Sequence, residues 1–220
     1  MSKYNLASDC QIPGLSEIYI NNFGHIFDGT FVEVGAFDGE SFSNTCCLAD
    51  MGWTGLYIEP IKEYADKCRH RHRYSTNTTT VEVGVAAEEC EVDMWLGGVL
   101  STASEKAYKN FLNIEWAKNR FVNAKKQTVK MRPLDTILEE NNVKKGFEIL
   151  VIDVEGYEWE TIRNFDIKKW SPKMVIIELH DTNPNYAALK EECDNIVKYF
   201  DDNDYAATYK DTTNTVYIKR

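Results

Sequence analysis

The sequence lacks the features of a membrane-embedded protein. It has no run of about 18 apolar residues, the length that a membrane-spanning helix needs, and its mean hydropathy is −0.44. Residues 1–9 carry one lysine and no apolar stretch that would serve as the core of a signal peptide. We therefore expect a cytoplasmic protein with no membrane partner.

The sequence also lacks the cysteine patterns of zinc sites and disulfide frameworks. No C-x-x-C pair occurs, and no cysteine stands beside closely spaced histidines. We expect reduced thiols that are mostly buried. The six cysteines are Cys10, Cys46, Cys47, Cys68, Cys90 and Cys193.

Positive charge is scarce. The chain has 25 lysines and arginines against 35 aspartates and glutamates, a net charge of −10. Affinity for nucleic-acid phosphates depends on a basic surface, so we expect no nucleic-acid partner. The one dense basic run, residues 69–73, is better explained by a helix C-terminus, where cations offset the helix dipole.

What is present indicates a single α/β domain. A chain of 220 residues is long enough for one core and short for two. Apolar, β-branched runs alternate with stretches of helical spacing, which is typical of a mostly parallel sheet covered by helices. These runs lie at residues 30–34, 55–58, 79–85, 148–152 and 173–179.

The segments on either side of this core are predicted as follows. Residues 1–29 form an N-terminal segment, residues 30–181 form the core of the domain, and residues 182–220 form a helix and a closing hairpin. The helix is predicted over 185–200, and the hairpin strands over 205–210 and 215–219.

An insertion interrupts the alternation of strands and helices at about residues 100–130. Tyr108, Phe111 and Trp116 recur there with helical spacing, so we predict a helical insertion above the sheet edge. Its aromatic side chains either stack on a ligand or anchor the insertion to the sheet.

Two glycines follow the first predicted strand. In an open parallel sheet, ligands bind beyond the carboxyl ends of the strands, and Gly35 and Gly39 let the backbone approach a ligand closely. The pattern Gly-x-Gly-x-x-Gly of nicotinamide-dependent enzymes is incomplete in this chain, because Ala36 and Phe37 occupy the middle of the turn. The turn therefore favours a cofactor without a pyrophosphate.

An acidic residue ends the second predicted strand. Glu59 stands 24 positions after Gly35, and a carboxylate there can accept the hydroxyl hydrogens of a ribose. Together with the glycine turn, Glu59 predicts a site for an adenosine-containing cofactor.

Acidic and basic residues also follow the fourth and fifth predicted strands. Because neighbouring parallel strands end at the same edge of the sheet, we expect these groups to share one rim and to form a reaction centre. They are Asp153, Glu155 and Glu158 after the fourth strand, and Glu178, His180 and Asp181 after the fifth.

These motifs, in this order, resemble the FkbM family of methyltransferases. The resemblance covers roughly residues 30–181, and its most specific part is the run Ile-Asp-Val-Glu-Gly-Tyr-Glu at residues 152–158. Glu33 and Phe37 stand where the family usually has aspartate and asparagine. The resemblance implies a class I fold with seven strands, the last antiparallel, and helices on both faces.

The resemblance also implies S-adenosyl-L-methionine as the methyl donor and a hydroxyl acceptor on a sugar or a polyketide-type product. We favour a sugar or glycan hydroxyl. The residues expected to bind the cofactor are Glu33, Gly35, Ala36, Asp38, Gly39, Ser43, Glu59, Pro60, Val85, Ala86 and Asp153.

A sugar hydroxyl is a poor nucleophile, so the reaction needs a general base or a divalent cation. In one version, Asp153, Glu178 and Asp181 bind Mg²⁺ or Mn²⁺ and His180 is the base. In the other, His180 or Asp153 acts directly, and Glu155 and Glu158 shape the site or grip acceptor hydroxyls. Asp153, His180 and Glu178 are thus the predicted catalytic residues.

Other functions remain compatible with the sequence. The acceptor can be another small molecule, a protein or an RNA, and the fold can serve as a binding protein without catalysis. The sequence fixes neither the acceptor nor the oligomeric state.

Overall fold

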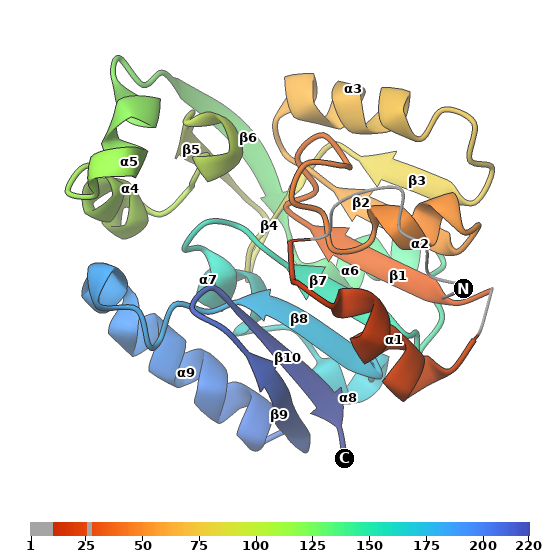
Figure 1. The fold of residues 1–220 in the computed structure, drawn as a ribbon. Coiled ribbons are helices and arrows are strands. Elements are labelled where there is room, and N and C mark those ends of the chain that lie inside the picture. The colour runs from red at the N-terminus through yellow and green to blue at the C-terminus, as the bar shows by residue number, and fades with distance from the viewer. Residues whose placement is uncertain (1–10, 26–27) are drawn as a thin grey trace.

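The computed structural model describes residues 11–25 and 28–220, and in this part a seven-stranded sheet forms the centre of the molecule (Figure 1). The strands lie in the order β3-β2-β1-β7-β8-β10-β9. The five neighbouring strands β3, β2, β1, β7 and β8 pair in parallel, whereas β10 runs antiparallel to both β8 and β9. The bounds are β1 Thr30–Val34, β2 Thr54–Ile58, β3 Thr78–Val81, β7 Ile149–Ile152, β8 Met174–Glu178, β9 Tyr205–Lys210 and β10 Asn214–Lys219. The predicted fold class is confirmed.

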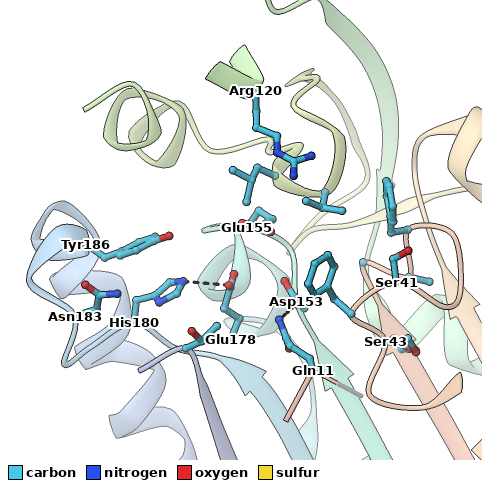
Figure 2. A pocket seen from close by; sticks show the side chains of 18 of the residues that line it. Gln11, Ser41, Ser43, Arg120, Asp153, Glu155, Glu178, His180, Asn183 and Tyr186 are labelled. Atoms are coloured by element: carbon cyan, nitrogen blue, oxygen red, sulfur yellow. Dashed lines mark hydrogen bonds and ion pairs between the residues drawn. The ribbon is translucent and has the colours of Figure 1, made fainter. Parts of the chain in front are cut away.

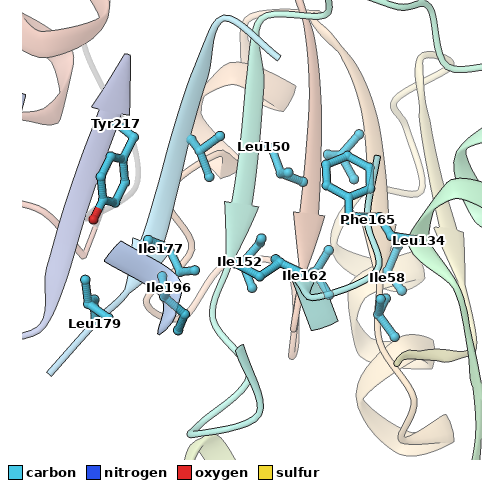
Figure 3. Packing of buried hydrophobic residues seen from close by; sticks show 14 of the residues in the cluster. Ile58, Leu134, Leu150, Ile152, Ile162, Phe165, Ile177, Leu179, Ile196 and Tyr217 are labelled. Carbon is cyan, nitrogen blue, oxygen red and sulfur yellow. The ribbon is translucent and has the colours of Figure 1, made fainter. Parts of the chain in front are cut away.

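Helices cover both faces of this sheet because successive strand residues point to opposite sides. Val32, Leu150 and Val175 belong to a core that includes residues of α6, α7 and α9, part of which is drawn in Figure 3. Their neighbours Phe31 and Ile149 belong to a second core with residues of α1, α2 and α3. The helices are α1 Leu15–Phe23, α2 Cys46–Asp50, α3 Lys62–Arg71, α6 Leu134–Glu140, α7 Glu158–Ile162, α8 Ile167–Trp170 and α9 Lys190–Asp201.

The prediction of one strand over residues 79–85 was wrong. The chain leaves the main sheet after β3, and β4 (Gly84–Val85) joins a separate three-stranded sheet of order β4-β6-β5. Strands β5 (Cys90–Trp95) and β6 (Lys126–Arg132) pair antiparallel. Both were missed because Glu91 and Asp93 separate the apolar residues of β5, and because the apolar residues of β6 are only Val129 and Met131.

The insertion is helical, as predicted, but shorter than the range 100–130, because residues from Lys126 onward belong to β6. It leaves the small sheet after β5 and returns to it through β6. Its elements are η1 Gly98–Leu100, α4 Glu105–Phe111, α5 Glu115–Lys118 and η2 Asn119–Phe121.

Aromatic contacts hold the insertion together. Tyr108 stacks on Trp95 of β5 at 4.9 Å between ring centroids, and Phe111 stacks on Phe121 at 5.5 Å. Phe111 also meets Tyr186 edge-on at 6.2 Å. Tyr108 and Phe111 therefore anchor the insertion, which was one of the two roles predicted for its aromatic residues.

The C-terminal prediction is confirmed in outline. The helical stretch divides into a 3₁₀ segment, η3 (Pro184–Leu189), followed by α9, and the hairpin β9–β10 closes the sheet. The basic run at residues 69–73 begins in the last turn of α3, as predicted. Arg71 there pairs with Glu40 and Asp50, while His72 is buried and stacks on Tyr57.

Of the described cysteines, Cys46, Cys47, Cys68 and Cys193 are buried and Cys90 is exposed, as the prediction of mostly buried thiols requires. Cys10 lies outside the described residues. None of the helices in the described ranges combines the length and the apolar character needed to cross a bilayer.

Candidate active site

A cavity of about 310 Å³ opens at the carboxyl ends of β1, β7 and β8 (Figure 2). We call the lower side of the cavity the cavity floor. It is made by residues at the ends of these strands or just after them: Gly35, Ala36, Asp153, Glu155, Glu178 and His180. We call the upper side of the cavity, contributed by the insertion, the cavity roof: Val99, Leu100, Trp116 and Arg120. Residues Gln11, Glu33, Phe37, Ser41, Phe42, Ser43, Asn183, Asn185, Tyr186 and Thr213 complete the lining.

The Gly35 turn brings the first strand into close contact with the fourth parallel strand. Gly35 has φ 85°, and a Cβ there would lie 1.7 Å from the carbonyl oxygen of Asp153. Its N–H donates to the Ile58 carbonyl at 3.0 Å. Only glycine allows β1, β2 and β7 to approach one another at this point.

Glu33 holds the loop that follows this turn. Its carboxylate accepts hydrogen bonds from the hydroxyls of Ser43 and Thr45 and from the backbone N–H of Asn44. Burial raises the pKa of Glu33 to about 7, although these hydrogen bonds act in the opposite direction. Glu33 thus orders residues 43–45 at the start of α2 and also lines the cavity.

Glu59 lies in a smaller cavity of about 60 Å³ that shares Gly35, Phe37 and Asp153 with the main one. Its two carboxylate oxygens accept the backbone N–H groups of Phe37 at 2.9 Å and Ile61 at 2.8 Å. Burial raises its pKa to about 7. Each carboxylate oxygen keeps acceptor capacity, because it can accept a second hydrogen bond.

Three carboxyl groups converge on the cavity floor. Asp153, Glu155 and Glu178 each offer one oxygen, and these oxygens lie within 4.8 Å of one another. Desolvation, followed by the charge of Glu178, raises the pKa of both Asp153 and Glu155 well above the usual range. A group of this kind either retains protons at neutral pH or attracts a cation.

A turn in the left-handed conformation directs Glu155 into the cavity. Glu155 has φ 56° and Gly156 has φ 88°, and the left-handed conformation costs a non-glycine residue about 1 kcal/mol. Oε1 of Glu158 accepts the N–H groups of Val154 at 3.1 Å and Gly156 at 3.0 Å. Glu158 therefore stabilises the turn that directs Glu155 into the cavity.

His180 is held between two acceptors. Its Nδ1 lies 3.1 Å from the Thr212 carbonyl and its Nε2 lies 3.1 Å from Oε1 of Glu178. Burial lowers its pKa, but the hydrogen bond and charge of Glu178 outweigh burial, and the net shift is upward. Its ring also stacks on Tyr186 at 3.7 Å. A carbonyl only accepts, so Nδ1 carries hydrogen, and His180 is cationic when Nε2 also donates to Glu178.

The structure brings most of the predicted site residues together. Glu33, Gly35, Ala36, Ser43, Asp153, Glu178 and His180 line the main cavity. Glu59 and Pro60 line the adjoining cavity, and Val85 lies with Gly35 and Pro60 around a third of about 30 Å³.

Four predicted residues lie apart from these cavities. Asp38 accepts hydrogen bonds from the N–H groups of Glu40 and Ser41 and so fixes its own turn, and the Gly39 carbonyl bonds His72. Ala86 is buried and donates its N–H to the Arg132 carbonyl. Asp181 pairs with Lys210, and Glu155 takes its place beside Asp153 and Glu178.

Several lining residues were missed from the sequence. Ser41, Phe42, Asn183 and Asn185 follow strand ends that had been identified, so their nearness in sequence was an available signal. Arg120 lies in the predicted insertion and Thr213 between the predicted hairpin strands, but neither pattern indicated that these side chains face the cavity. Gln11 comes from a segment with no recognisable pattern. Gln11 donates to Oδ2 of Asp153 at 3.2 Å and so contacts the reaction centre directly.

A family model, that of the methyltransferase FkbM domain, matches residues 33–207 of this chain. No curated protein matches it by sequence. The family match covers both acidic strand ends, the insertion and all of η3 and α9.

Solved methyltransferases share the fold at low sequence identity. Methyltransferase FkbM from Methylobacillus flagellatus KT aligns with a TM-score of 0.51 and 14% identity, over 87% of this chain and 43% of that one. An O-methyltransferase from Bacillus cereus, solved in complex with SAH, aligns with a TM-score of 0.52 and 13% identity, over 98% and 85%. The O-methyltransferase TomG from Streptomyces achromogenes, involved in tomaymycin synthesis and solved with SAM, gives 0.50 and 13%, over 93% and 77%. This chain spans less than half the length of the M. flagellatus protein.

Proposed function

Because this chain belongs to the FkbM methyltransferase family, we propose that it binds S-adenosyl-L-methionine and methylates a hydroxyl group of a sugar or glycan. The observation that carries the proposal is that the Gly35 turn and the carboxyls of Asp153 and Glu178 line one cavity. A cofactor seated on the turn and a hydroxyl seated on the carboxyls are then neighbours.

The residues present fit the cofactor. Glu59 is a buried carboxylate with acceptor capacity for two ribose hydroxyls, and it lies beside the turn formed by Gly35 and Ala36. The B. cereus and S. achromogenes proteins, which share the fold, were solved with SAH and SAM. S-adenosyl-L-methionine supplies a methyl group activated by the positive sulfur.

Hydrogen-bonding side chains at the same cavity support a polyhydroxyl acceptor. Ser41, Asn183 and Asn185 line it alongside the carboxyl groups. Amide and hydroxyl side chains can both donate and accept, as recognition of sugar hydroxyls requires. The main cavity also lies within the usual size range of small-molecule sites, roughly 300–1,000 Å³.

Asp153 is the base in this proposal. Burial raises the pKa of Asp153 well above the usual range, so its ionised form is a stronger base than an exposed carboxylate. Both ring nitrogens of His180 are engaged by Thr212 and Glu178. His180 therefore orients Glu178 and balances its charge, and Asp153 is left to take the hydroxyl proton.

A divalent cation is the alternative to direct base catalysis. Hard oxygen ligands suit Mg²⁺ and Mn²⁺, and the oxygens of Asp153, Glu155 and Glu178 lie close enough to share one ion. Such an ion would lower the pKa of an acceptor hydroxyl. In this version Glu155 replaces Asp181 in the predicted ligand set.

Calorimetric titration with S-adenosyl-L-homocysteine, with and without Mg²⁺, tests cofactor binding. Micromolar affinity is expected, and absence of binding under both conditions would favour a non-catalytic role. Methyl transfer is then measured on a panel of methyl glycosides, before and after exhaustive chelation. Retained activity after chelation supports Asp153 as the base, and loss that Mg²⁺ restores supports the cation.

Two variants sharpen this test. Asp153→Asn keeps the shape of the side chain but removes the base, and a loss of about 10²-fold or more in kcat is expected. Asp181→Asn breaks the ion pair with Lys210 and is expected to keep its Mg²⁺ response, because Asp181 lies outside the converging carboxyls. Normal turnover by Asp153→Asn would exclude both versions.

A further inference from the structure

Large apolar side chains are exposed around the mouth of the main cavity. Trp116 in the cavity roof is 59% exposed, and Phe42, in the loop after β1, is 58% exposed. Both line the cavity. Phe42 also has φ 61°, in the left-handed region, which is energetically unfavourable for a residue other than glycine. Exposed rings of this size at a cavity mouth are typical of a ligand-binding surface.

An arginine shares the face of the roof that carries Trp116. Arg120 stands four residues after Trp116 in the continuous helical stretch α5–η2, so the two side chains lie on the same side of it. Both line the cavity. In Figure 2, Arg120 points from the roof toward the cavity, above Glu155.

Arg120 has no protein partner within the described part of the chain. Its neighbour Lys118, in contrast, pairs with Glu115 at 2.5 Å. Several carboxyl groups line the same cavity, yet none lies within ion-pair distance of Arg120. A guanidinium that faces a cavity with its five N–H donors unused by the protein is suited to an incoming anion.

The floor and the roof of the cavity therefore differ in charge. The cavity floor carries the carboxyl groups of Asp153, Glu155 and Glu178, and the roof carries the cation Arg120. The floor residue His180 already contacts Glu178 and the Thr212 carbonyl, so an anionic ligand group is attracted to Arg120 in the roof. A hydroxyl group, being neutral and a donor, is accepted by the floor.

We infer that the acceptor is an acidic sugar, whose carboxylate or phosphate binds Arg120 while its ring packs on Trp116. The inference rests on the proposed function and names the acceptor class of that site. Arginine binds carboxylate and phosphate oxygens through two parallel hydrogen bonds. This contact turns the opposite side of the sugar toward Asp153 and so selects which hydroxyl is methylated.

Matched pairs of acceptors test the inference. Methyl glucoside is compared with methyl glucuronoside, methyl galactoside with methyl galacturonoside, and glucose with glucose 6-phosphate, with formation of S-adenosyl-L-homocysteine as the readout. We expect the wild-type protein to favour an anionic member by tenfold or more in kcat/KM. The uronosides and the phosphate separate the two sources of negative charge.

Arg120→Gln is expected to abolish this preference, chiefly by raising KM for the anionic member of each pair. Lys118→Gln, on the same segment but outside the cavity, is the matched control and keeps the preference. Trp116→Ala is expected to raise KM severalfold for both members of a pair, and Leu112→Ala, also exposed on the insertion, is its control.

Three results would overturn the inference: a wild-type preference for neutral sugars, a preference that survives Arg120→Gln, or a tenfold loss of S-adenosyl-L-homocysteine affinity in Arg120→Gln. The last would assign Arg120 to the carboxylate of the cofactor. If no sugar is methylated, the proposed activity fails separately, and the uronosides are titrated into protein loaded with S-adenosyl-L-homocysteine. Binding that Arg120→Gln weakens tenfold supports the subsite, and absence of binding overturns it.

Discussion

The floor and the roof of the cavity are built in opposite ways. The floor follows strands that are buried on both faces, and hydrogen bonds hold the side chains of Asp153, Glu178 and His180 there. The roof belongs to an insertion whose buried residues Phe111 and Phe121 join the core on one face of the sheet, whereas Trp116 and Arg120 there are exposed. In our proposal the floor carries the chemistry, and the exposed side chains of the roof carry acceptor recognition.

This difference implies that substitutions in the floor and in the roof should have different effects. Strand ends are positioned by the main sheet, so a change there should disturb stability and cofactor binding together. The insertion is positioned by its own aromatic contacts and by contact with η3. A change there should weaken acceptor binding and leave the cofactor in place.

The largest effect is expected from Gly35→Ala in the floor. The added Cβ would lie 1.7 Å from the Asp153 carbonyl oxygen, so β1 and β7 must separate. We expect loss of S-adenosyl-L-homocysteine binding by at least about 10²-fold, measured by calorimetry, and a lower Tm. Gly52→Ala is the control, because Gly52 also has positive φ but nothing lies within 4 Å of its added Cβ. Equal losses in both variants would show that backbone strain, and not the clash, is responsible.

A smaller and local effect is expected from Phe121→Ala in the roof. Phe121 is buried against Phe111 and Tyr108, and removal of a buried phenylalanine side chain costs about 3–5 kcal/mol. We expect faster hydrogen exchange over residues 96–125 and a higher acceptor KM, with cofactor affinity changed less than threefold. Val122→Ala, at an exposed position, should alter neither. Loss of cofactor binding in Phe121→Ala would show that roof and floor fold as one unit.

The smallest effect concerns pH and Glu59. Its pKa rises from 4.5 unfolded to about 7 folded because of burial, so the folded state binds the proton more tightly. The resulting stabilisation is complete below about pH 4.5 and is lost as pH rises through about 7. Between pH 5 and pH 8 the loss is about 2 kcal/mol.

Glu59→Gln cannot titrate and should therefore lose less stability over this range in urea unfolding of the cofactor-free protein. Parallel profiles for wild type and Glu59→Gln would mean that Glu59 keeps an ordinary pKa in the folded state.

The main sheet and the floor could be predicted from the sequence because burial on both faces leaves continuous apolar runs, and the groups that follow such runs must meet at one edge. The strand ends at Gly35, Asp153 and Glu178 were identified in this way. The small sheet was missed because charged residues interrupt the apolar residues of β5, β6 has only two apolar residues, and the two strands pair across an insertion of some 30 residues.

The role of individual side chains was harder to predict. Asp38 and Asp181 carry carboxylates suited to ligand binding and lie close to strand ends. However, Asp38 accepts hydrogen bonds within its own turn and Asp181 pairs with Lys210. Glu155 reaches the floor because the backbone enters the left-handed region there. The direction of a side chain after a strand depends on such turns, and a residue pattern does not report it.

The hydrogen bond between His180 and the Thr212 carbonyl has a consequence for how the protein is made. The turn at residues 211–214 supports the rim, and Gln11 contacts Asp153 from the other end of the chain. Contacts between residues so distant in sequence form late in folding. The reaction centre therefore forms only after residues up to Thr212 have left the ribosome, and a nascent chain that has already folded its parallel strands still lacks a complete site.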